Sequence, residues 1–264
     1  MRICYNHFMS YLIDSHCHLH DRQFFKEEQA EEMVKRSMKN GVKKIVCIGT
    51  DPIDSMEAKD FANSHEGVYW TYGVHPEETN GGKKIDYSNA IFDRGCEKLV
   101  AVGDVGLDYH SEDHDRDAQI KLFNEMLQLA KDNDLPVSFH VRNAFDDFFA
   151  VTANFPEVRG VVHSFTDSKK TLKKILNETD YYVGVNGLAT YSTLPTPPLE
   201  RILLETDAPF LTPVPFRGMI NESAYVLDIA EWLSNKLELD FETVEKETTE
   251  NAERLFRFSD SPDR

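Results

Sequence analysis

The sequence predicts an α/β protein, a distorted TIM-type (β/α)₈ barrel, on two observations. Eight short β-rich runs recur along the chain, and helix-like charged segments fill many of the gaps between them. Most runs lack strict polar–apolar alternation, which is typical of parallel strands buried on both faces. The runs are YLIDSH (11–16), KKIVCIG (43–49), GVYWTYGVH (67–75), LVAVGD (99–104), PVSFH (136–140), GVVHSF (160–165), YYVGVNG (181–187) and RILLETD (201–207). Eight strands alternating with helices over about 250 residues favour a barrel.

The segments between the strands support this prediction. Residues 27–41 end at Gly41, which suits a helix C-terminus, and residues 115–134 carry apolar side chains at helical spacing. Between the last two strands only STLPTPPLE remains, and its three prolines disfavour a helix. The seventh helix is therefore predicted to be shortened or missing, and helical segments at 221–238 and 241–256 are predicted to close the barrel. No linker divides the chain, so residues 1–264 are predicted to form one domain.

Composition gives further expectations. No apolar run approaches the 18 or so residues that span a bilayer, and the first residues lack the apolar core of a signal peptide. The four cysteines form no CxxC pair, which favours reduced thiols and a cytoplasmic location. They are Cys4, Cys17, Cys47 and Cys96. Cys17 and Cys47 are expected to be small buried residues.

The charge balance bears on the partners. Asp and Glu outnumber Lys and Arg by 46 to 29, so the net charge is −17. Such a surface repels polyanions and argues against broad duplex binding through a basic face. It is compatible with cutting a phosphodiester in a small pocket where bound cations carry the positive charge.

Polar side chains end most of the predicted strands. The carboxyl ends of barrel strands converge on one face, where barrel enzymes place their chemistry. His16 and His18 lie two residues apart, so both should point into the barrel mouth while Cys17 points outward. The other strand-end residues are His75, Asp104, His140, His163 and Asp207.

A single such histidine is usually a hydrogen-bonded polar residue, and the two aspartates alone could cap helices. Together, however, four histidines and two aspartates match the ligands of Zn²⁺, Mn²⁺ or Mg²⁺. Six ligands exceed the four typical of one zinc ion, so a two-metal centre is predicted.

The motifs that carry these residues resemble those of TatD-type metal-dependent deoxyribonucleases of the amidohydrolase superfamily. The resemblance covers nearly the whole chain in order and spacing. The motifs are DSHCHL (14–19), GVHP (73–76), VGDVGLDY (102–109), PVSFHVRNA (136–144), VVHSFTDS (161–168), LLETDAPFLTPVPFRG (203–218) and NAERLF (251–256).

The resemblance implies a ligand set and an activity. His16, His18 and Asp207 would hold the first ion, His140 and His163 the second, and Asp104 would bridge the two. The family hydrolyses phosphodiesters, often as a 3′→5′ exonuclease on single-stranded DNA. A single-stranded nucleic acid is thus the implied partner, with no membrane and no obligate protein partner.

Further roles follow for individual side chains. Asp207 would take the proton of the attacking water. His75 is a candidate for contacting the phosphate or the leaving group. Arg142 and Arg217 could pair with phosphate oxygens, although ion pairs on the barrel rim would explain them equally well. Glu205 should face the same way as Asp207 but one layer deeper, where it would support a ligand.

Four features depart from the family pattern. Asp104 stands where the family usually has Glu, His20 where Asp is common, and Ser223 near a usual proline; the seventh helix also looks shortened. Because Asp is one methylene shorter than Glu, the second ion is expected to bind more loosely. Two other functions stay open. One is hydrolysis of a small ester, lactone or amide at the same site, which the net charge favours mildly. The other is a binding protein without activity, which the retained ligating side chains disfavour.

Overall fold

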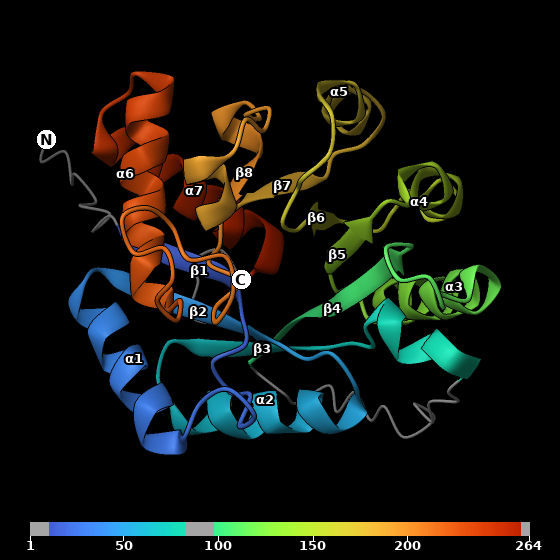
Figure 1. Cartoon of the computed structure of the whole chain (residues 1–264), viewed down its shortest axis with the longest axis horizontal. Helices are drawn as coiled ribbons and strands as arrows, with labels where there is room; N and C mark the ends of the chain where they lie inside the picture. The colour runs from blue at the N-terminus through green and yellow to red at the C-terminus, as the bar shows by residue number, and fades with distance from the viewer. Residues whose placement is uncertain (1–10, 83–97, 260–264) are drawn as a thin grey trace, which may run out of the picture.

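Eight parallel strands form one continuous sheet in the computed structural model, which describes residues 11–82 and 98–259. Their order in the sheet follows their order in the chain. The strands are β1 (Leu12–Cys17), β2 (Val42–Ile48), β3 (Val68–Tyr72), β4 (Leu99–Asp108), β5 (Val137–Arg142), β6 (Gly160–Val162), β7 (Tyr182–Val185) and β8 (Ile202–Leu204). A parallel bridge between Cys17 and Ala208 links the two ends of the sheet, which curls into a nearly closed barrel (Figure 1). The predicted fold class is confirmed.

Helices surround the strands on the outside of the barrel (Figure 1). They are α1 (Glu27–Lys39), α2 (Pro52–Ser64), α3 (Arg116–Asp132), α4 (Phe145–Thr152), α5 (Lys169–Glu178), α6 (Val226–Leu237) and α7 (Phe241–Phe256). Short 3₁₀ helices lie at η1 (Pro76–Gly82) and η4 (Ser223–Tyr225). The fully described stretch between β7 and β8 holds only two more 3₁₀ turns, η2 (Gly187–Tyr191) and η3 (Leu199–Arg201). The shortened seventh helix is thereby confirmed.

Local sequence fixes where the helices begin. The Asp51 carboxylate accepts hydrogen bonds from the backbone N–H groups of Ile53 and Asp54, and Pro52 opens α2 without an N–H to satisfy. Asp115 caps α3 in the same way through the N–H of Ala118. The caps hold the turns that lead from the carboxyl ends of β2 and β4 into the helices, next to the barrel mouth.

The C-terminal helices close the barrel as predicted. Leu255 and Phe256 at the end of α7 share one buried cluster with Ile13 of β1 and Leu203 of β8. Asn251, also on α7, donates hydrogen bonds to the carbonyls of Leu199 and Ile202. Helix α7 thus packs against the seam between β8 and β1.

All eight strands differ from their predicted bounds by at least one residue, and the sixth and eighth end three residues early, at Val162 and Leu204. The third strand ends at Tyr72 rather than at residue 75. The fourth continues to Asp108, four residues beyond the predicted end, because its register against β5 extends through Gly106 with His140 and Asp108 with Arg142. This extension places Asp108 beside the strand end that carries His140.

Cys17 and Cys47 are buried free thiols, as predicted, whereas Cys4 and Cys96 lie outside the described residues. None of the helices in the described ranges is both long and apolar enough to cross a membrane. A single domain over 1–264 and a cytoplasmic location stay predictions.

Candidate metal centre

The six predicted ligand residues meet at the carboxyl ends of five strands. His16 belongs to β1 and His18 follows it, Asp104 lies in β4 and His140 in β5, and His163 and Asp207 follow β6 and β8. Together with His75, they form three groups of possible ligand atoms, and the atoms of each group lie within 4.8 Å of one another. The groups are His16 with His18 and Asp207, His16 with Asp104 and His163, and His75 with Asp104 and His140.

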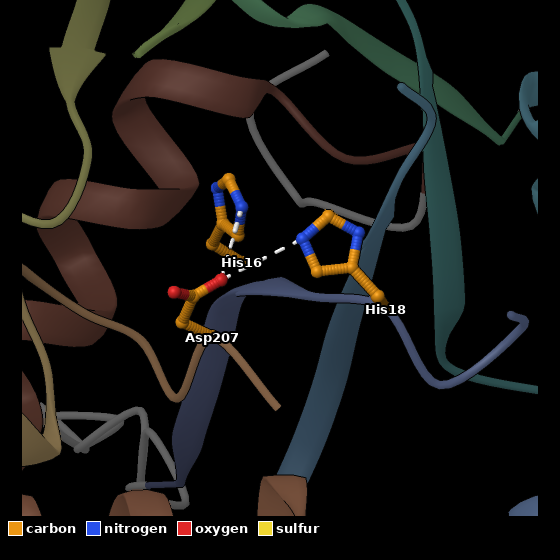
Figure 2. A group of neighbouring side chains, drawn as sticks. All are labelled: His16, His18 and Asp207. Atoms are coloured by element: carbon orange, nitrogen blue, oxygen red, sulfur yellow. Dashed lines mark ion pairs between the residues drawn. The ribbon is translucent and has the colours of Figure 1, made fainter. Parts of the chain in front are cut away.

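The first group is compact. Asp207 Oδ1 lies 3.7 Å from His16 Nε2 and 3.6 Å from His18 Nε2, and both rings point toward the carboxylate (Figure 2). Ligand atoms lie about 2.0–2.2 Å from a zinc ion, so two ligand atoms on one ion are about 3–4 Å apart. The three side chains have the spacing of donors around one ion.

Asp104 lies between the ligands predicted for the first ion, His16 among them, and those predicted for the second ion, His140 and His163. Its Oδ2 lies 3.8 Å from His16 Nε2. Its Oδ1 lies 4.0 Å from His140 Nδ1 and 4.0 Å from His163 Nε2. The short aspartate side chain therefore presents one oxygen to each half, which is the placement that a shared ligand needs.

Two buried atoms support the fit of these residues to a cation. His16 Nε2 and Asp104 Oδ1 have no hydrogen-bond partner, and both residues are buried. An unsatisfied buried donor or acceptor costs about 1–3 kcal/mol. Both atoms belong to chemical classes that divalent ions bind, and both point at the other ligand atoms.

The second ring nitrogen of each histidine has its own neighbour, as is usual for metal ligands. The pairs are His16 Nδ1 with Ser138 Oγ at 3.2 Å, His18 Nδ1 with the Ile48 carbonyl at 3.1 Å, His140 Nε2 with Asp108 Oδ2 at 2.8 Å, and His163 Nδ1 with Glu205 Oε1 at 3.5 Å.

These neighbours orient the lone pairs. The Ile48 carbonyl can only accept, so His18 Nδ1 carries the proton and Nε2 of the neutral ring offers its lone pair to the centre. By the same reasoning, His140 donates Nε2–H to Asp108 and turns Nδ1 toward Asp104. Glu205 is buried and accepts from the Ser164 N–H, and the charge of its carboxylate, 3.5 Å from His163 Nδ1, supports His163 from the layer below, as the sequence predicted.

The charges of the site act differently on the three best-buried imidazoles. Burial, and then neighbouring imidazoles, lower the pKa of His16 well below its ordinary value. Burial also opposes a charge on His18, but Asp207 outweighs it and raises the pKa of that ring. At His163, burial again opposes the charge, but Asp104 and Glu205 outweigh it and raise the pKa to about 10. A cation entering here must displace protons, because only the unprotonated nitrogen is a ligand.

The seam between β8 and β1 holds Asp207 in place. Its backbone has φ 57°, a left-handed conformation that Asp tolerates better than most residues. Its N–H donates to the His16 carbonyl at 2.8 Å. The preceding Thr206 donates from its N–H and its hydroxyl to the buried Asp14 carboxylate. The first ligand group is thus tied together through the backbone.

The predicted substrate contacts are placed unequally. The His75 ring lies 4.3 Å from the His140 ring, inside the centre, where it could also serve as a ligand. Arg142 is exposed at the end of β5, two residues after His140. Arg217 is exposed on the loop after β8, with its guanidinium 3.7 Å from the centre of the Tyr191 ring. Within the described residues, neither arginine forms an ion pair.

Three side chains that hold the site were not singled out from the sequence. Asp108 was missed because the fourth strand was predicted to end at Asp104; the alternation Asp104, Gly106, Asp108 was the available signal. Ser138, two residues before His140, could have been found in the same way. Asn186 donates to Glu205, and only the three-dimensional structure indicates that contact.

His20, which departs from the family pattern, belongs to a separate pair. Its Nε2 lies 2.9 Å from Asp54 Oδ1 at the start of α2. Burial opposes the charge of this ring, but the contact with Asp54 raises its pKa to about 10. His20 therefore contributes to the packing around β1 rather than to the three ligand groups.

Comparisons with known proteins agree with this architecture. Residues 13–257 match the family model described as TatD related DNase. The uncharacterized metal-dependent hydrolase YabD of Bacillus subtilis is 33% identical, over 94% of this chain and all of that protein. The 3′-5′ ssDNA/RNA exonuclease TatD of Erwinia billingiae is 30% identical, over 93% of this chain and 99% of that protein.

Solved structures extend the likeness to the fold. The crystal structure of YJJV, a TatD homolog from Escherichia coli K12, superposes with a TM-score of 0.83 at 28% identity, over 93% of this chain and 98% of that one. Family model, relatives and barrel all point the same way, and the chain belongs to the TatD-related DNase family of metal-dependent hydrolases.

Proposed function

We propose that the protein hydrolyses phosphodiester bonds in single-stranded nucleic acid, as a 3′→5′ exonuclease on single-stranded DNA. The observation that carries the proposal is Asp104, whose Oδ2 faces His16 and whose Oδ1 faces His140 and His163. A relative 30% identical over nearly its whole length is named a 3′-5′ ssDNA/RNA exonuclease, which supports the nuclease among the possible hydrolase reactions.

Two divalent ions, Mg²⁺, Mn²⁺ or Zn²⁺, fit this donor set. His16, His18 and Asp207 would hold one, His140 and His163 the other, and Asp104 would be shared. When bound, such ions polarise the phosphoryl oxygens and make water more acidic. The remaining steps belong to the side chains of this protein.

Asp207 is the base in this proposal. Its side chain is 14% exposed, against 6% for Asp104, so of the two carboxylates it opens further toward the mouth. Contacts with His16 and His18 orient Oδ1, and the seam hydrogen bond fixes the backbone. A carboxylate positioned in this way can accept the proton of water at its other oxygen, Oδ2, while the water oxygen attacks phosphorus.

Arg142 and Arg217 supply the positive charge for the phosphate. Both are exposed and free of ion pairs in the described part of the chain, so their forked donors are available to phosphate oxygens. His75, beside His140, is placed to donate a hydrogen bond to the phosphate or the leaving oxygen. The net charge of −17 disfavours long-range capture of duplex, which fits the trimming of a single-strand end.

The competing proposal is hydrolysis of a small ester, lactone or amide at the same centre, which the negative net charge favours. The two separate in a substrate panel of 5′-labelled single-stranded DNA, RNA and duplex beside a lactone and a phosphotriester. Each substrate is incubated with Mg²⁺, Mn²⁺ or Zn²⁺, and product lengths are resolved over time.

We expect single strands to shorten from the 3′ end in one-nucleotide steps, and no shortening with Asp207→Asn. Turnover of the small substrates alone would replace the nuclease proposal with the competing one. Tight metal binding without turnover of any substrate would indicate a binding protein.

A further inference from the structure

Exposed apolar side chains gather around the barrel mouth. In the described ranges, eight large apolar side chains are exposed, and seven of them lie on the loops after β1 and β8 or in the first turns of α2. The seven are Phe24, Ile53, Met56, Phe210, Val214, Met219 and Ile220. Apolar side chains concentrated at one rim, beside a polar centre, indicate a surface that meets a ligand.

Two of these residues form an aromatic pair next to the candidate metal centre. The rings of Phe24 and Phe210 are 5.2 Å apart and nearly perpendicular, at 83°. Phe24 is 47% exposed and Phe210 is 46% exposed. The Phe210 ring lies 6.5 Å from the ring of His18, one of the candidate ligands. An edge-to-face contact covers at most one face of one ring, so the pair leaves aromatic surface open.

The backbone fixes this pair relative to the centre. The Phe210 N–H donates to the Asp207 carbonyl at 2.8 Å, and its own carbonyl accepts from the Asn221 side chain. On the other loop, the Phe24 N–H donates to the Asp21 carbonyl, and the neighbouring Phe25 is buried and anchors the turn. The half-exposed rings therefore sit on ordered turns.

We propose that Phe24 and Phe210 form a stacking subsite for the nucleobase next to the scissile phosphodiester. The inference rests on the proposed function, because it takes the phosphate to lie at the metal centre. A base lies one sugar ring away from its phosphate, and the centre of the Phe210 ring lies 6.5 Å from that of the His18 ring. Stacking on an uncharged ring also needs no basic surface, which suits a chain with a net charge of −17.

The subsite has consequences for selectivity. Only an unstacked, unpaired base can slide against a protein ring, so the pair favours single strands and frayed ends over intact duplex. Every base has an aromatic face, so the pair should tolerate all four. Selection for single strands would thus arise from two phenylalanines rather than from charge.

The test pairs enzyme variants with matched substrates. One single strand ends in a natural 3′ nucleotide, and the other ends in an abasic tetrahydrofuran at that position. The variants are Phe210→Leu, Phe24→Leu, their combination, and Phe210→Trp, which keeps an aromatic ring. Leu239→Met is the control, because Leu239 is the exposed apolar residue of the described ranges that lies outside this surface, after α6.

We expect the double leucine variant to lower kcat/KM on the natural strand by about 10- to 100-fold, with little change on the abasic strand. Phe210→Trp and Leu239→Met should behave like wild type. Equal losses on both strands, or no loss on either, would overturn the subsite. So would a dimer of wild type that the leucine changes dissociate in sedimentation, because the patch would then be a contact between two copies of the chain.

Binding of the same strands is measured by fluorescence anisotropy. Together with the cleavage assay, it distinguishes failure of the subsite from failure of the proposed nuclease function. If wild type binds the natural strand more tightly than the abasic one but cleaves neither, the proposed function fails and the subsite holds. If it cleaves both strands equally well and the leucine variants do too, the proposed function holds and the subsite fails. If it neither cleaves nor distinguishes the strands, both fail.

Discussion

Asp108 and His140 form a carboxylate–imidazole pair at the barrel mouth, with Asp108 Oδ2 2.8 Å from His140 Nε2. The pair is held from behind by Gln119 of α3. The buried Gln119 amide accepts from the Asp108 N–H and donates to the Asp108 carbonyl, both at 2.8 Å. The end of β4 thereby sets the direction in which His140 points. The His140 ring is thus fixed from outside the ligand groups.

Asp108→Asn tests this relationship. The change preserves shape but removes the negative charge that fixes the His140 ring, and loss of such a partner typically weakens metal affinity about 10–100-fold. In a calorimetric titration with Mn²⁺, we expect the affinity to fall only for the ion held by His140 and His163. Asp180→Asn, on an exposed loop at the start of β7, is the matched control. Equal weakening of both halves would show that Asp108 acts on the fold rather than on His140.

Asp104 should control occupancy of the second ion. Its Oδ1 is 4.0 Å from each of two imidazole nitrogens, a long reach for a shared ligand. Asp104→Glu adds a methylene and should tighten the second ion, whereas Asp104→Ala should lose it, with the circular dichroism spectrum unchanged in both. Metal titration of the three proteins decides the point. Two equally tight ions in all three would mean that Asp104 is not shared.

Asp207→Asn should abolish turnover while the protein stays folded. The amide keeps the shape but cannot accept the proton of water, and loss of positioned acid–base catalysis typically costs about 10²–10⁴-fold. The change also removes one anionic ligand, so kcat should be measured at saturating metal to separate the two effects. Activity near that of wild type under those conditions would assign the base elsewhere.

The His20–Asp54 pair predicts a pH dependence of stability. The folded pKa of His20 is raised to about 10, above the ordinary 6.5, so its contribution is complete below about pH 6.5 and is lost as pH rises toward 10. Burial raises the pKa of Asp54, but His20 outweighs it and lowers the value, so that contribution is lost only in acid.

Urea unfolding at about pH 6 and about pH 9 measures this effect. The free energy of unfolding should fall more between these values in wild type than in His20→Gln. His110→Gln, whose side chain is exposed, should follow wild type. Parallel slopes in all three proteins would exclude the pair as the titrating element.

Much of the fold and of the candidate site could be predicted because the strands are short apolar runs that end in polar side chains. His16 and His18 share a direction through simple alternation, and the prolines between β7 and β8 exclude a helix. Asp108 could not be predicted because the length of β4 depends on its pairing with β5, which is distant in sequence. The contact between Phe24 and Phe210 could not be predicted for a similar reason, because their loops meet only when β8 closes against β1.

The central claim is that two divalent ions occupy this mouth and share Asp104. Anomalous scattering from crystals grown with Mn²⁺ tests it most directly. The account predicts two peaks, a stronger one among His16, His18 and Asp207 and a weaker one beside His140 and His163, with Asp104 between them. A single ion held only by His140 and His163, or manganese bound away from Asp104, would contradict it.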